Sequence, residues 1–114
     1  MSRPVLSTHV LDTAVGSPAV GVFIELFKQH NEGSWTQWHS AVTSSDGRAL
    51  FPFSKESMAP GTYKLKFDVD TYYKTLGKKT IYDYVEIVFT TEEDQHYHMP
   101  LLLSPYGYTT YRGS

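Results

Sequence analysis

Residues 63–70 read Tyr63-Lys64-Leu65-Lys66-Phe67-Asp68-Val69-Asp70, an unbroken alternation of apolar and charged side chains. Side chains along a β-strand point alternately to the two faces of a sheet, so this pattern predicts a strand with one buried and one solvated face. The expected buried face carries Tyr63, Leu65, Phe67 and Val69. The stretch indicates a chain built from half-buried strands.

The same two-residue period recurs on both sides of this stretch. Strong strand patterns lie at residues 20–27, 85–89 and 96–103, and weaker ones at 5–11, 35–42, 49–53 and 106–112. Turn-forming residues, such as Gly16-Ser17-Pro18 and Ala59-Pro60-Gly61, separate them. Seven or eight short strands with turns about every 8–12 residues predict an all-β fold, an antiparallel β-sandwich.

One short helix is expected at residues 71–76. Asp70 or Thr71 is suited to cap its first turn, and Gly77 stands where a helix end favours a left-handed residue. The chain has 114 residues and shows no repeat or linker, which predicts a single domain over residues 1–114.

Composition excludes several classes of function. Hydrophobic residues make up 40% and charged residues 19%, with a formal charge of −2, so a basic surface for nucleic acid is not expected. No apolar run approaches the roughly 18 residues of a membrane helix, and residues 1–5 lack the apolar core of a signal peptide. Without cysteine there is no disulfide, thiolate zinc site or cysteine nucleophile.

Histidine is the first candidate for chemistry, and the chain has five: His9, His30, His39, His96 and His98. His30 and His39 lie in or beside a polar turn and are interpreted as surface residues. His9 lies in a predicted strand, on the face that carries Ser7 and Leu11. A single histidine in such a strand is usually structural, so His9 alone does not identify a site.

The sequence His96-Tyr97-His98 places two imidazoles on one face of a predicted strand. Three interpretations remain open: two ligands of a zinc ion, a general acid or base, or the polar face of an edge strand. No third ligand stands at a fixed local spacing, so the evidence for metal is weak.

Arg48 leaves the turn Asp46-Gly47-Arg48. It is either a solvated hairpin residue or a guanidinium placed to bind a carbonyl or an anionic ring oxygen. The residues Tyr111-Arg112-Gly113-Ser114 follow a dense aromatic run without a disposable polar tail, which suggests that they occupy a defined place.

The whole chain resembles the transthyretin-like family, and within it the 5-hydroxyisourate hydrolases. The motifs that carry the resemblance stand in the family's order: Leu6-Ser7-Thr8-His9-Val10-Leu11-Asp12-Thr13-Ala14, Asp46-Gly47-Arg48, Gly61-Thr62-Tyr63-Lys64-Leu65, Val85-Glu86-Ile87-Val88-Phe89, His96-Tyr97-His98-Met99-Pro100-Leu101-Leu102-Leu103-Ser104-Pro105 and Tyr108-Thr109-Thr110-Tyr111-Arg112-Gly113-Ser114. Tyr111-Arg112-Gly113-Ser114 is the most specific of them.

The resemblance implies a transthyretin-like (prealbumin-like) sandwich of two four-stranded sheets with one short helix. It implies a homotetramer, a dimer of dimers with active sites at the dimer–dimer interface. The reaction would be hydrolysis of 5-hydroxyisourate to 2-oxo-4-hydroxy-4-carboxy-5-ureidoimidazoline, in urate degradation to allantoin. No cofactor or metal is implied, and neither a nucleic acid nor a membrane is an expected partner.

The same resemblance implies that the catalytic residues are His9, Arg48, His98 and Ser114. It implies that the substrate-binding residues are Tyr111, Arg112 and Gly113. One histidine would deprotonate water and Arg48 would stabilise the developing oxyanion. Arg112 would add positive charge or fix the tail. Which histidine is the base stays open at this point, with His9 favoured.

Two other functions compete. A carrier of iodothyronines would share the fold, but such carriers lack the Tyr-Arg-Gly-Ser end and the set of His9, Arg48 and His98. A metal-binding sandwich would use His96 and His98. The expected compartment is the cytoplasm, with the peroxisome as the alternative.

Overall fold

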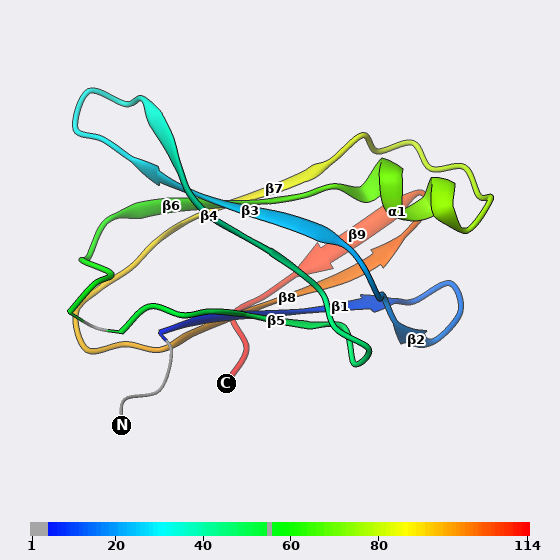
Figure 1. Cartoon of the computed structure of the whole chain (residues 1–114), viewed down its shortest axis with the longest axis horizontal. Coiled ribbons are helices and arrows are strands. Elements are labelled where there is room, and N and C mark those ends of the chain that lie inside the picture. The colour runs from blue at the N-terminus through cyan, green and yellow to red at the C-terminus, as the bar shows by residue number, and fades with distance from the viewer. Residues whose placement is uncertain (1–4, 55) are drawn as a thin grey trace.

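The computed structural model describes residues 5–54 and 56–114, which form two β-sheets that face each other, with one short helix at one end (Figure 1). Residues 1–4, part of the segment on which the absence of a signal peptide was predicted, lie outside the described residues. The elements in chain order are β1 (Leu6–Asp12), β2 (Ser17–Pro18), β3 (Phe23–Gln29), β4 (Trp35–Val42), β5 (Arg48–Phe51), β6 (Thr62–Phe67), α1 (Val69–Thr75), β7 (Val85–Thr90), β8 (Tyr97–Ser104) and β9 (Gly107–Thr110).

The predicted sandwich with a short helix is confirmed, and two details of one sheet differ from expectation. This sheet has the order β2-β1-β8-β9, and β5 also pairs with β1, which makes five strands instead of four. Because β2 pairs with the end of β1 and β5 with its beginning, the two lie end to end along one edge. The sheet is therefore four strands wide.

The second difference is the direction of one pair. β1 and β8 run parallel, whereas every other pair in both sheets is antiparallel. The chain between β1 and β8 contains all four strands of the opposite sheet, β4-β3-β6-β7, as well as β2 and β5, so no hairpin forces β1 and β8 to run in opposite directions.

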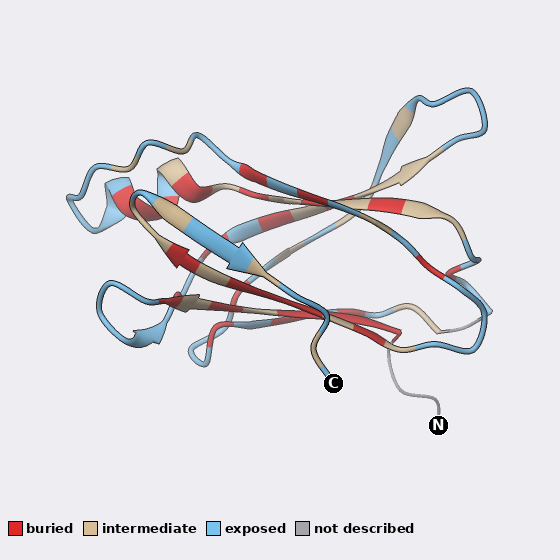
Figure 2. Cartoon of the chain, turned by 180° about the vertical axis from the view of Figure 1, so that it is seen from behind, coloured by how far each residue is buried: buried red, intermediate tan, exposed pale blue. Residues whose placement is uncertain are grey.

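The core lies between the sheets. Tyr63, Leu65 and Phe67 of β6 are fully buried, as their alternation predicts, and so is Val69, the first residue of α1. In Figure 2 the buried residues, coloured red, lie along strands of both sheets. Apolar side chains on the inner faces thus supply the main driving force for this fold.

The helix starts earlier than predicted. Its N-cap is Asp68, not Asp70 or Thr71, and the Asp68 carboxylate accepts a hydrogen bond from the Thr71 amide at 3.3 Å. Asp70 instead pairs with Lys74 one turn on, at 2.8 Å. Gly77 follows the helix with a φ of 67°, the left-handed conformation expected there.

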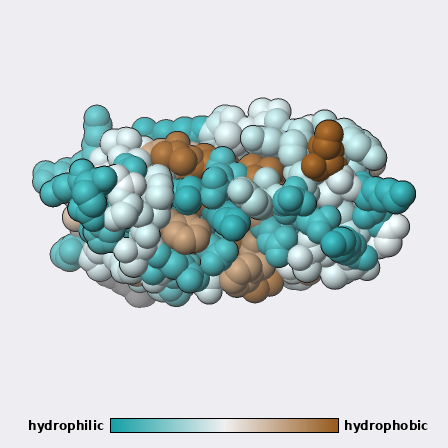
Figure 3. Space-filling model, turned by 90° about the horizontal axis from the view of Figure 1, so that it is seen from above, coloured by the Kyte–Doolittle hydropathy of each residue, from teal (hydrophilic) through white to brown (hydrophobic). Residues whose placement is uncertain are grey.

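Several apolar side chains are exposed on the outer surface, among them the cross-strand neighbours Phe23 and Val42. Seen from above in Figure 3, hydrophobic residues form separate patches within a mostly hydrophilic face. Scattered exposed apolar residues are normal in folded proteins. α1, the one helix within residues 5–54 and 56–114, lacks the length and apolarity needed to cross a membrane.

Candidate active site

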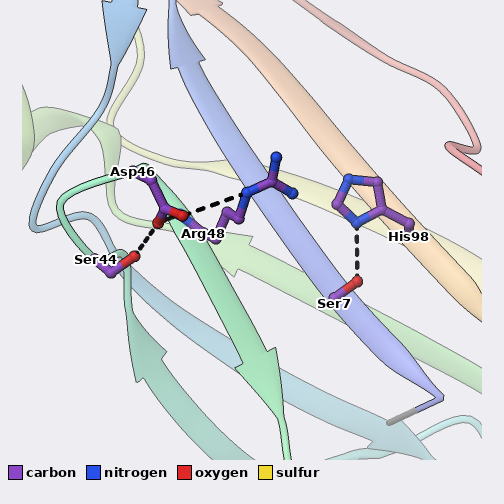
Figure 4. Close-up of polar contacts among 5 residues, drawn as sticks. All are labelled: Ser7, Ser44, Asp46, Arg48 and His98. Atoms are coloured by element: carbon purple, nitrogen blue, oxygen red, sulfur yellow. Dashed lines mark hydrogen bonds and ion pairs between the residues drawn. The ribbon is translucent and has the colours of Figure 1, made fainter. Parts of the chain in front are cut away.

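Three neighbouring strands bring the predicted catalytic side chains to one outer face. The alternation of β1 buries Leu6, Thr8 and Val10 and leaves His9 on the other side, partly exposed. His9 pairs with Arg48 across the β1–β5 ladder, and Ser7 pairs with His98 across β1–β8. Paired residues share a face. In Figure 4 the Arg48 side chain reaches over β1 toward His98.

A short turn holds Arg48 in place. Asp46 accepts a hydrogen bond from Ser44 Oγ, and its other oxygen lies 3.5 Å from Arg48 Nε. The Ser44 hydroxyl, first, and the Arg48 group lower the pKa of Asp46 from its ordinary value, so the carboxylate stays charged. Within the described residues Asp46 is the only acid paired with Arg48. The ends of the guanidinium face the site.

Gly47 allows this turn to lie against β1. Its φ is 77°, and a Cβ there would lie 2.5 Å from the Val10 carbonyl oxygen and 3.3 Å from His9 Cδ2. Any side chain at this position would push the turn away from β1. The glycine therefore fixes how closely Arg48 and His9 approach.

His98 is the most constrained of the titratable groups in this site. Its Nδ1 is hydrogen-bonded to Ser7 Oγ at 2.9 Å. Burial, first, and then the positive charges of Arg48, His9 and His96 lower the pKa of His98 from its ordinary value of 6.5. The imidazole is consequently neutral at neutral pH and can accept a proton.

Gly113 presses the tail onto His98. The Gly113 amide donates to the His98 carbonyl at 2.7 Å. A Cβ on Gly113 would lie 2.5 Å from His98 Cδ2, closer than real Cβ contacts come. The ring of His98 is thus held between Ser7 and the Gly113 backbone. Tyr111 and Ser114, on either side in sequence, are exposed.

Arg112 makes contacts that fix the tail. Its guanidinium donates to Gln95 Oε1 and to the His96 carbonyl, each at 3.0 Å, and lies 4.5 Å from the centre of the Tyr97 ring. Of the two roles expected from the sequence, these contacts favour tail fixing. The predicted role in substrate binding stays a prediction.

The metal interpretation lacks a third ligand in the described part of the chain. His96 precedes β8 and His98 lies within it, but residues 5–54 and 56–114 contain no group of three His, Cys, Asp or Glu side chains that could hold a metal ion.

The contact of Ser7 with His98 was not predicted from the sequence. Ser7 had been placed on the face of His9, but only the parallel β1–β8 register brings it opposite His98.

The fold is a transthyretin-type sandwich, since it has two packed sheets, each four strands wide, and one short helix. Its polar site, which contains His9, Arg48 and His98, lies on the outer face of one sheet. The sequence model of the HIUase/Transthyretin family matches residues 6–113, and the chain belongs to this family.

Known proteins resemble the chain over nearly its whole length. It is 48% identical to a 5-hydroxyisourate hydrolase of Mus musculus, covering 96% of this chain and 94% of the relative. It is 43% identical to the 5-hydroxyisourate hydrolase of Caulobacter vibrioides, covering 96% and 97%. The crystal structure of transthyretin from Sparus aurata superposes with a TM-score of 0.91 at 30% identity, covering 97% of each chain. The expected fold family is therefore confirmed.

The depressed pKa of His98 gives the first testable prediction. His98 should titrate below 6.5, and Arg48→Gln should raise its pKa toward that value because a repelling positive charge is lost. Burial remains, so the rise should be incomplete. NMR titration of the ring measures both. Lys79→Gln, which removes an exposed positive charge elsewhere, is the control. A titration of wild-type His98 at or above 6.5 would contradict this assignment.

Gly113→Ala should displace the His98 ring, because the new methyl group would overlap Cδ2. Gly107→Ala is the matched control, since its Cβ would meet Ser104 Oγ at an ordinary 3.6 Å. We expect large shifts of the His98 ring resonances and faster exchange of the residue-113 amide in the first variant only. Unchanged His98 resonances in Gly113→Ala would show that the tail does not press on the ring.

Proposed function

We propose that this protein hydrolyses 5-hydroxyisourate, using His98, Arg48 and His9 on the outer face of the β5-β1-β8 strands. The observation that carries the proposal is that His98 is neutral and lies near the Arg48 guanidinium, with its ring held by Ser7 and Gly113. An imidazole that can take a proton next to a fixed cation is suited to water-driven opening of a ring amide. Relatives over nearly the whole chain bear the name 5-hydroxyisourate hydrolase.

The proposed reaction adds one water to the ring amide. The water oxygen bonds to the ring carbonyl carbon and its proton goes to a histidine. The carbonyl oxygen becomes an oxyanion, which Arg48 stabilises. The C–N bond then breaks, and the histidine returns its proton to the departing ring nitrogen. The product is 2-oxo-4-hydroxy-4-carboxy-5-ureidoimidazoline, which carries the new carboxylate.

The contacts favour His98 over His9 as the base, in contrast to the preference stated from sequence. His98 has a hydrogen-bonded Nδ1 and a packed ring, so its orientation is fixed. His9 lies next to Arg48 and can position substrate from the other side. Ser114 and Tyr111, exposed beside Gly113, would wall the site.

We propose that the enzyme works as an assembly of four chains. The site lies on an outer sheet face and is open toward solvent, as the 55% exposed side chain of Arg48 indicates. A second dimer packed over this face would turn it into a cleft and exclude water from the reacting ring. The proposed homotetramer is a dimer of dimers with its sites at that contact.

The direct test follows the decay of 5-hydroxyisourate, generated from urate with urate oxidase, by its ultraviolet absorbance. The wild-type protein should accelerate decay well above the spontaneous rate. His98→Ala should lower kcat by about 10²–10⁴-fold and Arg48→Ala by about 10²–10³-fold. His30→Ala is the matched control, because His30 is exposed in the β3–β4 connection.

Two results would contradict the proposal. If the folded wild-type protein did not accelerate decay, the carrier hypothesis would replace it, and thyroxine binding would be the next assay. If His30→Ala lost as much activity as His98→Ala, the site would have been assigned to the wrong face.

We further expect catalysis without a metal ion. The steps above need only an imidazole and a guanidinium, so activity should survive incubation with excess EDTA and dialysis. Decay rates before and after treatment, together with the metal content of the dialysed protein, measure this. A loss of activity restored by Zn²⁺ would instead support a metal site that includes His96 or His98.

A further inference from the structure

Among residues 5–54 and 56–114, Ser7 is the one whose hydroxyl is hydrogen-bonded to the ring of His98. Its Oγ lies 2.9 Å from His98 Nδ1, and the two residues face each other directly in the β1–β8 register (Figure 4). Ser7 is 9% exposed, so water has little access to compete for this contact. Within the described residues the hydroxyl makes no other hydrogen bond to a side chain. The bond therefore has an ordinary length and is shielded from water.

A bond to Nδ1 determines what the other ring nitrogen can do. A neutral imidazole carries its proton on one nitrogen, and the partner of that nitrogen selects the tautomer. If Nδ1–H donates to Ser7 Oγ, then Nε2 holds a lone pair and can accept a proton. If the serine hydroxyl donates to Nδ1, then Nε2 holds the proton and cannot serve as a base.

We propose that Ser7 accepts a hydrogen bond from His98 Nδ1–H and thereby keeps His98 in the tautomer whose Nε2 is free to take a proton from water. Ser7 is a positioning residue, since it acts through His98 and does not touch the reacting atoms. The inference rests on the proposed function for its consequence, but its central claim, the tautomer of His98, does not require activity.

Contacts occupy the Nδ1 and Cδ2 positions of the His98 ring, so the Nε2 edge is the one that faces the site. Gly113 closes off the Cδ2 position and Ser7 holds Nδ1. The Arg48 guanidinium extends toward the ring from the β5 side (Figure 4). A substrate carbonyl bound to Arg48 would therefore lie on the Nε2 side of the ring.

A purely structural role for Ser7 would not predict the same behaviour. Replacing Ser7 by alanine keeps the small size and the strand backbone but removes the acceptor. Ser7→Thr keeps the hydroxyl and adds a β-branch that strands favour. If the hydroxyl matters for His98, the alanine variant loses function and the threonine variant recovers most of it.

The test combines tautomer and kinetics. In wild-type protein, ¹⁵N-labelled at histidine, long-range ¹H–¹⁵N spectra at pH 8 should show His98 with its proton on Nδ1. Ser7→Ala should convert it to a mixture of tautomers. Its kcat should fall about tenfold to a hundredfold, the range found for hydrogen-bond partners that orient metal-bound histidines, with KM little changed. Ser40→Ala, an exposed serine on β4, should behave as wild type.

The outcomes separate this inference from the proposed function. A wild-type His98 with its proton on Nε2 would overturn the inference, and that measurement needs no variant to fold. So would a Ser7→Ala protein with unchanged tautomer and kcat. An Nδ1–H tautomer that Ser7→Ala loses, in a wild-type protein without hydrolase activity, would uphold the positioning role and overturn the proposed function alone.

Discussion

The parallel pairing of β1 with β8 is the constraint on which the rest of the molecule depends. It runs in register from Leu6 opposite Tyr97 to Asp12 opposite Leu103. Because side chains alternate along both strands, this one register sends half of them into the core and the other half to the outer face. A slip of one residue would bury His98 and expose its apolar neighbours. Core and site are therefore specified by the same ladder.

Buried polar contacts pin this ladder at both of its ends. Near its start the Thr8 hydroxyl donates to the Met99 carbonyl at 2.6 Å, inside the core. At its far end the Thr13 hydroxyl donates to the Leu103 carbonyl of β8 at 3.1 Å, and the buried Asp12 carboxylate ties β1 to α1 by accepting from the Tyr72 hydroxyl at 2.9 Å. Burial and this carboxylate raise the pKa of Tyr72. Since unpaired buried polar groups are costly, shifted registers are disfavoured.

Much of the fold could be predicted from the sequence, because strand alternation is a local signal. The alternation of β6 and the face assigned to His9 were read correctly from neighbouring residues. The β1–β8 pairing could not be, since residues such as Ser7 and His98 lie 91 positions apart. Site residues came from motif resemblance, which names positions but not contacts. It left the role of Arg112 open, and only the contacts of its guanidinium favour tail fixing.

The distance between β1 and β8 along the chain also has a kinetic meaning. During synthesis from the N-terminus, β1 is complete at residue 12, whereas the first residue of β8 is number 97. β5 covers one edge of β1 earlier, but the other edge stays unpaired until β8 emerges. Synthesis proceeds at about 5–20 residues per second, so that edge of β1 stays unpaired for several seconds before β8 is made. Such long-range closure slows folding and leaves a strand edge open to intermolecular pairing.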